Sequence, residues 1–182
     1  MEKRIAISCS ALARIMIDGK YLLLVENGVL KPIGGALKYT DESLPFLNSV
    51  DWQTQRTDND MRIDIPEDVY DIFKTWHNLF IQRETSVHRE VMEELQPFLQ
   101  LDISDMTETY ITTIETIGDE GPSKMDLAYK NRLFQIHIVE FSDQVIEEIK
   151  SAVHTLADLV LVTKEQIINE ENNISPHTKH IL

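Results

Sequence analysis

The heptapeptide Arg-Glu-Val-Met-Glu-Glu-Leu at positions 89–95 decides how the rest of the chain is interpreted. On a predicted helix, Glu90, Glu93 and Glu94 stand at positions i, i+3 and i+4, so they share about 100° of its surface. Three carboxylates so close repel one another unless water and salt screen them or a hard divalent cation neutralises them. Arg89 lies four residues before Glu93 and can hydrogen-bond a carboxylate. The heptapeptide alone therefore indicates a solvated acidic face or a metal site, and the solvated face is the simpler interpretation.

Apolar residues at helical spacing surround this heptapeptide and extend upstream of it. They predict a helix over 84–95 with one buried face, formed by Val87, Val91, Leu95 and Phe98. Another helix is expected to begin at Pro66, because proline suits a first helical turn and apolar side chains recur over 69–80. Residues 40–63 show no period and are expected to form a long loop or insertion.

The rest of the chain favours strands on both sides of these helices. Asp18-Gly19 is a two-residue hairpin signal between apolar runs, and two later segments alternate in β-branched and apolar residues. We expect strands at 5–17, 21–25, 30–37, 107–117 and 133–141, a helix over 144–154, and a short apolar run at 159–162. This order of elements predicts an α/β fold.

Length and charge limit the classes of protein and of partner. At 182 residues, with 42% hydrophobic and 26% charged residues, the chain suits one well-packed domain. A net charge of −14 would repel long nucleic acids and anionic membranes, because no run of Lys or Arg offsets it. A small phosphorylated ligand would need a divalent cation between its phosphates and the protein's carboxylates.

The single cysteine and the N-terminal segment bear on location. Cys9 excludes an intrachain disulfide, and its place in a strand pattern predicts a small buried side chain. Lys3 and Arg4 precede a short apolar run, but Ser8 and Ser10 interrupt that run, so we interpret it as a strand. No segment approaches the roughly 20 apolar residues of a spanning helix. We expect a cytoplasmic protein.

With the glycine pair upstream, the heptapeptide resembles the signature of the Nudix hydrolase family. That signature is Gly, five residues, Glu, seven residues, and then Arg-Glu-U-x-Glu-Glu-x-Gly-U, where U is a bulky aliphatic residue. Residues 89–94 match its second half at every specified position, and Pro32-Ile33-Gly34-Gly35 is similar to the proline and double glycine before its first half. The resemblance implies a Nudix-like α/β/α sandwich with a mixed sheet, as a single domain over residues 1–182.

Departures from the signature are as informative as the matches. Gly35 precedes Arg89 by 54 residues, where the family has 14, which implies an insertion of about 40 residues over positions 40–82. The first glutamate of the signature falls on Ile81, and its closing glycine on Gln96. The three metal-type carboxylates are intact, so the resemblance is to a divergent member.

Two further segments narrow the resemblance. Arg-Glu-Thr at 83–85 and Asp-Met-Arg-Ile-Asp-Ile-Pro at 60–66 are similar to Nudix domains associated with bacterial second-messenger nucleotidyltransferases, the SMODS-associated group. This resemblance implies a domain that senses or processes nucleotides in antiviral defence.

The resemblance also implies a metal site and an activity. Glu90, Glu93 and Glu94 would ligate Mg²⁺ or Mn²⁺, the carbonyl of Gly35 would add an oxygen ligand, and Arg89 would orient the carboxylates. The implied reaction is hydrolysis of a phosphoanhydride in a nucleoside triphosphate or another nucleoside diphosphate derivative, releasing a nucleoside monophosphate. The implied partner is thus a small nucleotide, and a homodimer is compatible with the family.

A general base and a surface for the nucleotide's base are open to several assignments. The loop at 118–130 offers Glu120 or Asp119 as the general base, with Glu115 behind them, although each is more simply a surface acid. Aromatic side chains in the variable segments could stack on a base, although packing is the simpler role for each: Phe46, Trp52 and Tyr129.

Three functions compete on these observations. A magnesium-dependent pyrophosphohydrolase requires all three glutamates for turnover. A nucleotide-sensing domain, catalytically weak or inactive, uses the same pocket without cleavage, as the altered signature spacing permits. An acidic interaction domain, whose glutamates form a solvated face, responds to neither metal nor nucleotide.

Overall fold

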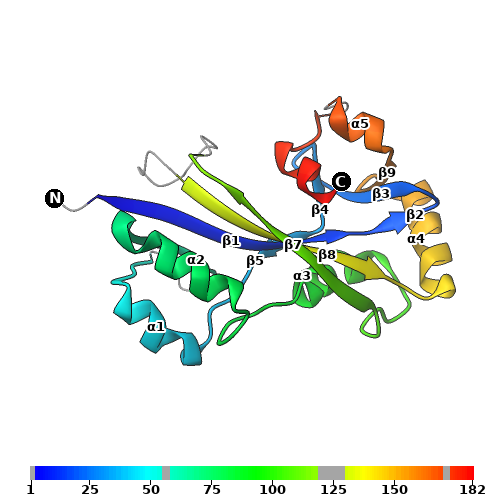
Figure 1. Cartoon of the computed structure of the whole chain (residues 1–182). Coiled ribbons are helices and arrows are strands. Elements are labelled where there is room, and N and C mark those ends of the chain that lie inside the picture. Colours follow the sequence, from blue (N-terminus) through cyan, green and yellow to red (C-terminus); the bar gives the residue numbers. More distant parts are fainter. Residues whose placement is uncertain (1–2, 55–57, 119–129, 170–172) are drawn as a thin grey trace. The chain divides into compact units, whose positions relative to one another are not determined.

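The protein is described here by a computed structural model, which covers residues 3–54, 58–118, 130–169 and 173–182 (Figure 1). The chain divides into two compact units, each made of three chain segments. Unit 1 comprises Met1–Ala11, Ala36–Thr85 and Thr113–Gln135, and unit 2 comprises Leu12–Gly35, Ser86–Thr112 and Ile136–Leu182. In the described parts of the chain, no helix is both long enough and apolar enough to cross a membrane.

The described strands form two sheets (Figure 1). They are β1 (Arg4–Arg14), β2 (Met16–Ile17), β3 (Lys20–Glu26), β4 (Val29–Pro32), β5 (Gly34–Ala36), β6 (Arg62–Pro66), β7 (Thr107–Thr116), β8 (Lys130–Glu140) and β9 (Leu159–Val162). The larger sheet has the order β5-β1-β8-β7, with β6 antiparallel to β1. The smaller has the order β2-β3-β4, with β9 antiparallel to β3.

Helices lie between these strands along the chain. They are α1 (Leu44–Ser49), α2 (Tyr70–Asn78), α3 (His88–Glu94), α4 (Asp143–Thr155) and α5 (Lys164–Ile168), with 3₁₀ turns at Asp41–Ser43, Glu67–Val69, Gln96–Phe98 and Pro176–Ile181. The expected α/β class is confirmed. The strands expected at 107–117 and 133–141 and the helix expected over 144–154 correspond to β7, β8 and α4.

Unit 1 corrects two predictions about the insertion. Residues 40–63 are not a structureless loop, since they contain α1 and the start of β6. Pro66 is the last residue of β6, because Ile63 and Ile65 alternate inward and pair with Ile7 and Ile5 of β1. The helix expected after it is present but begins later, since a 3₁₀ turn at Glu67–Val69 leads into α2 at Tyr70. Helix α1 and strand β6 are only five or six residues long, too short for a period to stand out.

The core of unit 1 is partly aromatic. Phe73 and Trp76 of α2 are buried, and Phe46 of α1 stacks on Trp76 with ring centroids 4.4 Å apart. Cys9 of β1 is fully buried, as predicted. The insertion thus packs as part of unit 1's own core.

In unit 2, two tight turns set the register of the small sheet. The pairs Asp18-Gly19 and Asn27-Gly28 both have positive φ angles, as two-residue hairpin turns require. The second turn pairs Leu24 of β3 with Lys31 of β4. The hairpin predicted at Asp18-Gly19 is confirmed, and Lys31 comes to lie three residues before the glycine pair.

Candidate metal-binding site of helix α3

The two glycines of the pair are required for different physical reasons. Gly34 has a φ angle of 143°, which disfavours any residue with a side chain. Gly35 leaves space for a side chain of α3, because a Cβ atom there would lie 2.2 Å from Oε2 of Glu90. Helix α3 therefore approaches β5 through the carboxylate of Glu90.

Glu108 of β7 fixes the start of α3. Its carboxylate accepts hydrogen bonds from the hydroxyl of Ser86 and the backbone N–H of Val87, and it lies 2.7 Å from Nδ1 of buried His137. Burial raises the pKa of Glu108, but these contacts outweigh it and lower the pKa to about 2. Because the helix begins at this cap, it covers 88–94, and the prediction of a helix over 84–95 was too long.

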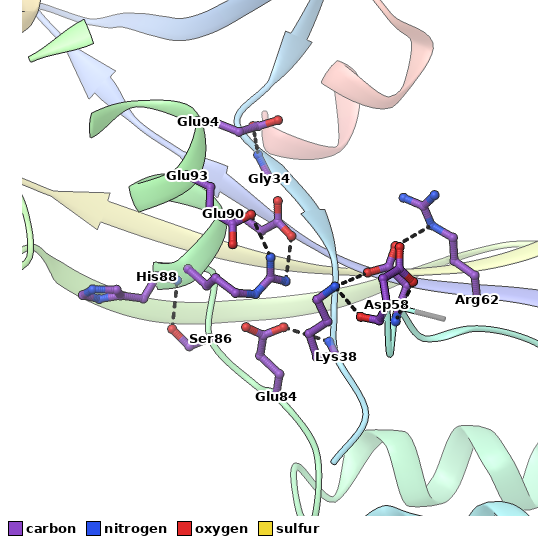
Figure 2. Close-up of polar contacts among 12 residues, drawn as sticks. Gly34, Lys38, Asp58, Arg62, Glu84, Ser86, His88, Glu90, Glu93 and Glu94 are labelled. Carbon is purple, nitrogen blue, oxygen red and sulfur yellow. Dashed lines mark hydrogen bonds and ion pairs between the residues drawn. The ribbon is translucent and has the colours of Figure 1, made fainter. Parts of the chain in front are cut away.

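Arg89 links the first two glutamates of the cluster. Its guanidinium lies 2.7 Å from Oε1 of Glu90 and 3.1 Å from Oε2 of Glu93 (Figure 2). Glu90 is the more enclosed, with 13% of its side chain exposed against 58% for Glu93. Burial raises the pKa of Glu90, Arg89 opposes the rise, and Glu94 and Glu93 add to it. A buried carboxylate beside two others favours a nearby cation.

The third glutamate, Glu94, has its own partners. Its Oε1 lies 2.7 Å from Nζ of Lys31. Its Oε2 accepts the backbone N–H of Gly34 at 2.9 Å (Figure 2). Nζ of Lys31 also lies 3.2 Å from Oε2 of Glu26. Burial lowers the pKa of Lys31, but Glu94 and Glu26 outweigh this effect and raise it. Sequence reasoning missed Lys31, because no local pattern connects it with a glutamate 63 residues away.

The cluster fits a hard divalent cation in its chemistry. Carboxylate oxygens are the ligands that Mg²⁺ prefers, and Glu90 sits in a space that only a glycine at position 35 leaves open. Within the described ranges, however, no three His, Cys, Asp or Glu side chains converge as a ligand set. The contacts of Glu94 explain part of the absence of a converging ligand set, because both of its carboxylate oxygens already have hydrogen-bond partners.

A second group of charged side chains lies in unit 1 and forms hydrogen bonds with the backbone. Nζ of Lys38 lies 2.7 Å from Oδ1 of Asp60 and donates to the carbonyl of Asp58. The backbone N–H of Lys38 donates to Oε2 of Glu84 at 2.8 Å (Figure 2). Glu84, the acidic residue nearest to the expected first glutamate of the signature, thus holds the chain after the glycine pair.

Several of the other predicted site residues have defined positions. Glu115 accepts a hydrogen bond from the hydroxyl of Tyr70 at 2.7 Å and lies 3.2 Å from Nζ of Lys74, so both of its oxygens are engaged. Trp52 packs against the ring of Tyr39. The other candidates fall outside the described residues: Asp119, Glu120 and Tyr129.

A mixed α/β fold in which a glycine pair makes room for the first glutamate of an Arg-Glu-x-x-Glu-Glu helix defines a Nudix-type domain. The family model described as SMODS-associated NUDIX domain matches residues 4–182, so the chain belongs to this family. The predicted resemblance and the Nudix-like α/β/α fold class are therefore confirmed. No curated protein matches the chain. Membership indicates a hydrolase-like function on nucleotide derivatives.

Proposed function

We propose that the protein is a Mg²⁺- or Mn²⁺-dependent pyrophosphohydrolase that acts on a nucleoside triphosphate or another nucleoside diphosphate derivative. The observation that carries this proposal is the half-buried carboxylate of Glu90, packed against Gly35 and held by Arg89. Enclosure is unfavourable for an acidic side chain that only contacts solvent, since burial penalises its charge. For a carboxylate that binds a cation, the same enclosure strengthens the interaction with the cation.

The residues of the chain have distinct roles in this proposal. Glu90, Glu93 and Glu94 hold the cation with the carbonyl of Gly35, and Arg89 orients the first two carboxylates. When bound, the cation would neutralise phosphate charge and make a water molecule more acidic. Overall, water adds to phosphorus and one phosphoanhydride P–O bond breaks. The products are a nucleoside monophosphate and either pyrophosphate, from a triphosphate, or the phosphorylated remainder of a diphosphate derivative.

The proposed reaction also requires a general base. Glu115 suits this role poorly, because Tyr70 and Lys74 occupy its two oxygens. We therefore keep Glu120 as the proposed base, with Asp119 as the alternative, from their position in the glycine-containing loop of the sequence.

A second candidate function is nucleotide sensing without cleavage. Its support is the engagement of Glu94, whose oxygens are held by Lys31 and by the N–H of Gly34. The signature's closing glycine is also replaced by Gln96. A domain that binds a nucleotide tolerates such changes more easily than one that must position three ligands for chemistry.

The family and the net charge of the chain support a proposal for its cellular role and its partner. The family description associates the domain with SMODS proteins, and we propose a role in bacterial antiviral defence with a small nucleotide as partner. The net charge of −14 disfavours long nucleic acids and anionic membrane surfaces. We also propose that the protein is cytoplasmic and forms a homodimer.

The test is release of phosphate or pyrophosphate from a panel of nucleoside triphosphates and diphosphate-linked nucleotides with Mg²⁺. We expect turnover by the wild type and none by the Glu93→Gln/Glu94→Gln variant. The matched control is Glu67→Gln/Asp68→Asn, which removes two exposed carboxylates from a 3₁₀ turn of unit 1 and should keep full turnover. No turnover on the whole panel, with a nucleotide still raising the melting temperature, would favour the sensor. No response to metal or nucleotide would leave a solvated acidic face.

A further inference from the structure

Lys31 is placed between two carboxylates that differ in their surroundings. On one side Glu94 belongs to the α3 cluster and has 19% of its side chain exposed, and on the other Glu26 has 60% exposed. The lysine itself is 23% exposed. The ammonium group therefore lies in an enclosed position beside the proposed metal ligands, with a second acid within reach.

This arrangement makes the lysine a competitor for any cation that Glu94 would bind. An ammonium group 2.7 Å from Oε1 occupies one of the oxygens that a metal would use, and the N–H of Gly34 occupies the other. A cation with two charges can replace the lysine, because the cluster carries three carboxylates. Glu26 remains 3.2 Å from Nζ, so the lysine keeps a counter-ion when it leaves Glu94.

We propose that Lys31 is a built-in counter-cation of the α3 cluster, which a divalent metal displaces from Glu94, and that this exchange sets the metal affinity. The inference rests on the proposed metal site. It assigns to Lys31 a role in metal affinity that is separate from catalysis. Removing the lysine should tighten metal binding, whereas loss of a residue that supports the site would weaken it.

The chain offers a matched control for this exchange. Lys38 in unit 1 lies at the same distance of 2.7 Å from Asp60, and the two side chains are 31% and 10% exposed. Lys38→Met therefore removes the same charge from a comparable ion pair that contains no proposed metal ligand. Lys31→Gln serves as a second variant, because it removes the charge and keeps a hydrogen-bond donor.

The experiment is a titration of the nucleotide-free protein with Mn²⁺, with free Mn²⁺ followed by electron paramagnetic resonance. We expect Lys31→Met to bind Mn²⁺ about tenfold more tightly than the wild type, as the loss of one competing charge-assisted hydrogen bond predicts. Lys31→Gln should shift the dissociation constant in the same direction, and Lys38→Met should leave it unchanged. In a Glu94→Gln background the effect of Lys31→Met should vanish.

Two results would overturn the inference. One is a Lys31→Met protein that folds and binds Mn²⁺ no more tightly than the wild type. The other is a tightening that persists in the Glu94→Gln background, since it would reflect net charge instead of exchange at Glu94. Turnover that depends on Glu93 and Glu94, without any effect of Lys31, would keep the proposed function and remove this inference. Tighter Mn²⁺ binding by Lys31→Met, with no turnover by the wild type on any substrate, would keep this inference and remove the proposed hydrolase function.

Discussion

Two lysine–carboxylate pairs, one in each unit, have the same length and different surroundings. Lys38 and Asp60 in unit 1 lie 2.7 Å apart, as do Lys31 and Glu94 in unit 2. The first pair is tied to the backbone, because Nζ of Lys38 also donates to the carbonyl of Asp58. The second belongs to a helix turn that carries three carboxylates.

The difference shows that distance alone does not assign a role to an ion pair. Lys38 holds a carboxylate and a carbonyl in place, so no other cation could replace it without loss. Lys31 shares its charge between Glu94 and Glu26 and can give up one of them. The first pair is a structural connection, and the second is a counter-ion that a stronger cation can replace.

The largest expected effect concerns Glu108. This residue lies in unit 2, yet its contacts are fixed like those of Lys38 in unit 1, so unit 2 contains both a fixed and an exchangeable carboxylate. The folded pKa of Glu108 is about 2, against 4.5 for a free glutamate. A lowered pKa adds stability that is complete above about pH 4.5 and is lost as the pH falls toward 2. The shift corresponds to about 3 kcal/mol, because one pKa unit is about 1.4 kcal/mol.

The measurement is urea unfolding of the wild type and of Glu108→Gln between pH 2 and pH 7. We expect Glu108→Gln to be less stable than the wild type at pH 7, and the difference in unfolding free energy between the two proteins to shrink by about 3 kcal/mol as the pH falls to 2. Parallel profiles for the two proteins would show that Glu108 is not a fixed connection at the start of α3.

The second prediction sharpens the comparison of the two pairs. Lys38→Met should cost about 1–2 kcal/mol, because the enclosed carboxylate of Asp60 loses its nearest cation and keeps Arg62 at 3.6 Å. Lys31→Met should cost less without metal, and Mn²⁺ should restore its stability. The measurement is urea unfolding with and without Mn²⁺. Equal recovery of both variants by Mn²⁺ would show that the two pairs do not differ in kind.

The sequence predicted the parts of the site that depend on local spacing. Glu90, Glu93 and Arg89 lie on one turn of a helix, so their proximity follows from the helical period. The short elements of the insertion escaped prediction because five or six residues show no clear period, and their formation depends on β1 and on the aromatic core. The contacts of Glu94 with Lys31 and of Glu108 with α3 join distant segments, which no local pattern encodes.

A third prediction separates space from backbone strain at the glycine pair. In Gly35→Ala, the new Cβ would displace the carboxylate of Glu90, which is the flexible end of a side chain. We expect a loss of stability below about 1 kcal/mol and a dissociation constant for Mn²⁺ at least tenfold weaker. Gly34→Ala should instead cost about 1–2 kcal/mol, because its φ of 143° strains any residue with a Cβ. Unfolding and Mn²⁺ titration of both variants provide the check, and unchanged Mn²⁺ affinity in Gly35→Ala would contradict the role assigned to the glycine.

The smallest effect should come from a third pair of the same length, Lys3 and Glu67 in unit 1. Nζ and Oε1 lie 2.7 Å apart, but the side chains are 66% and 50% exposed. Water screens both charges, and ordering two long side chains costs entropy, so Lys3→Met should change the free energy of unfolding by less than about 0.5 kcal/mol. Urea unfolding at low and at 0.5 M salt provides the measurement, with Lys38→Met as the reference. If Lys3→Met cost as much as Lys38→Met, distance would outweigh enclosure, and the contrast between the fixed and the exchangeable pair would lose its physical basis.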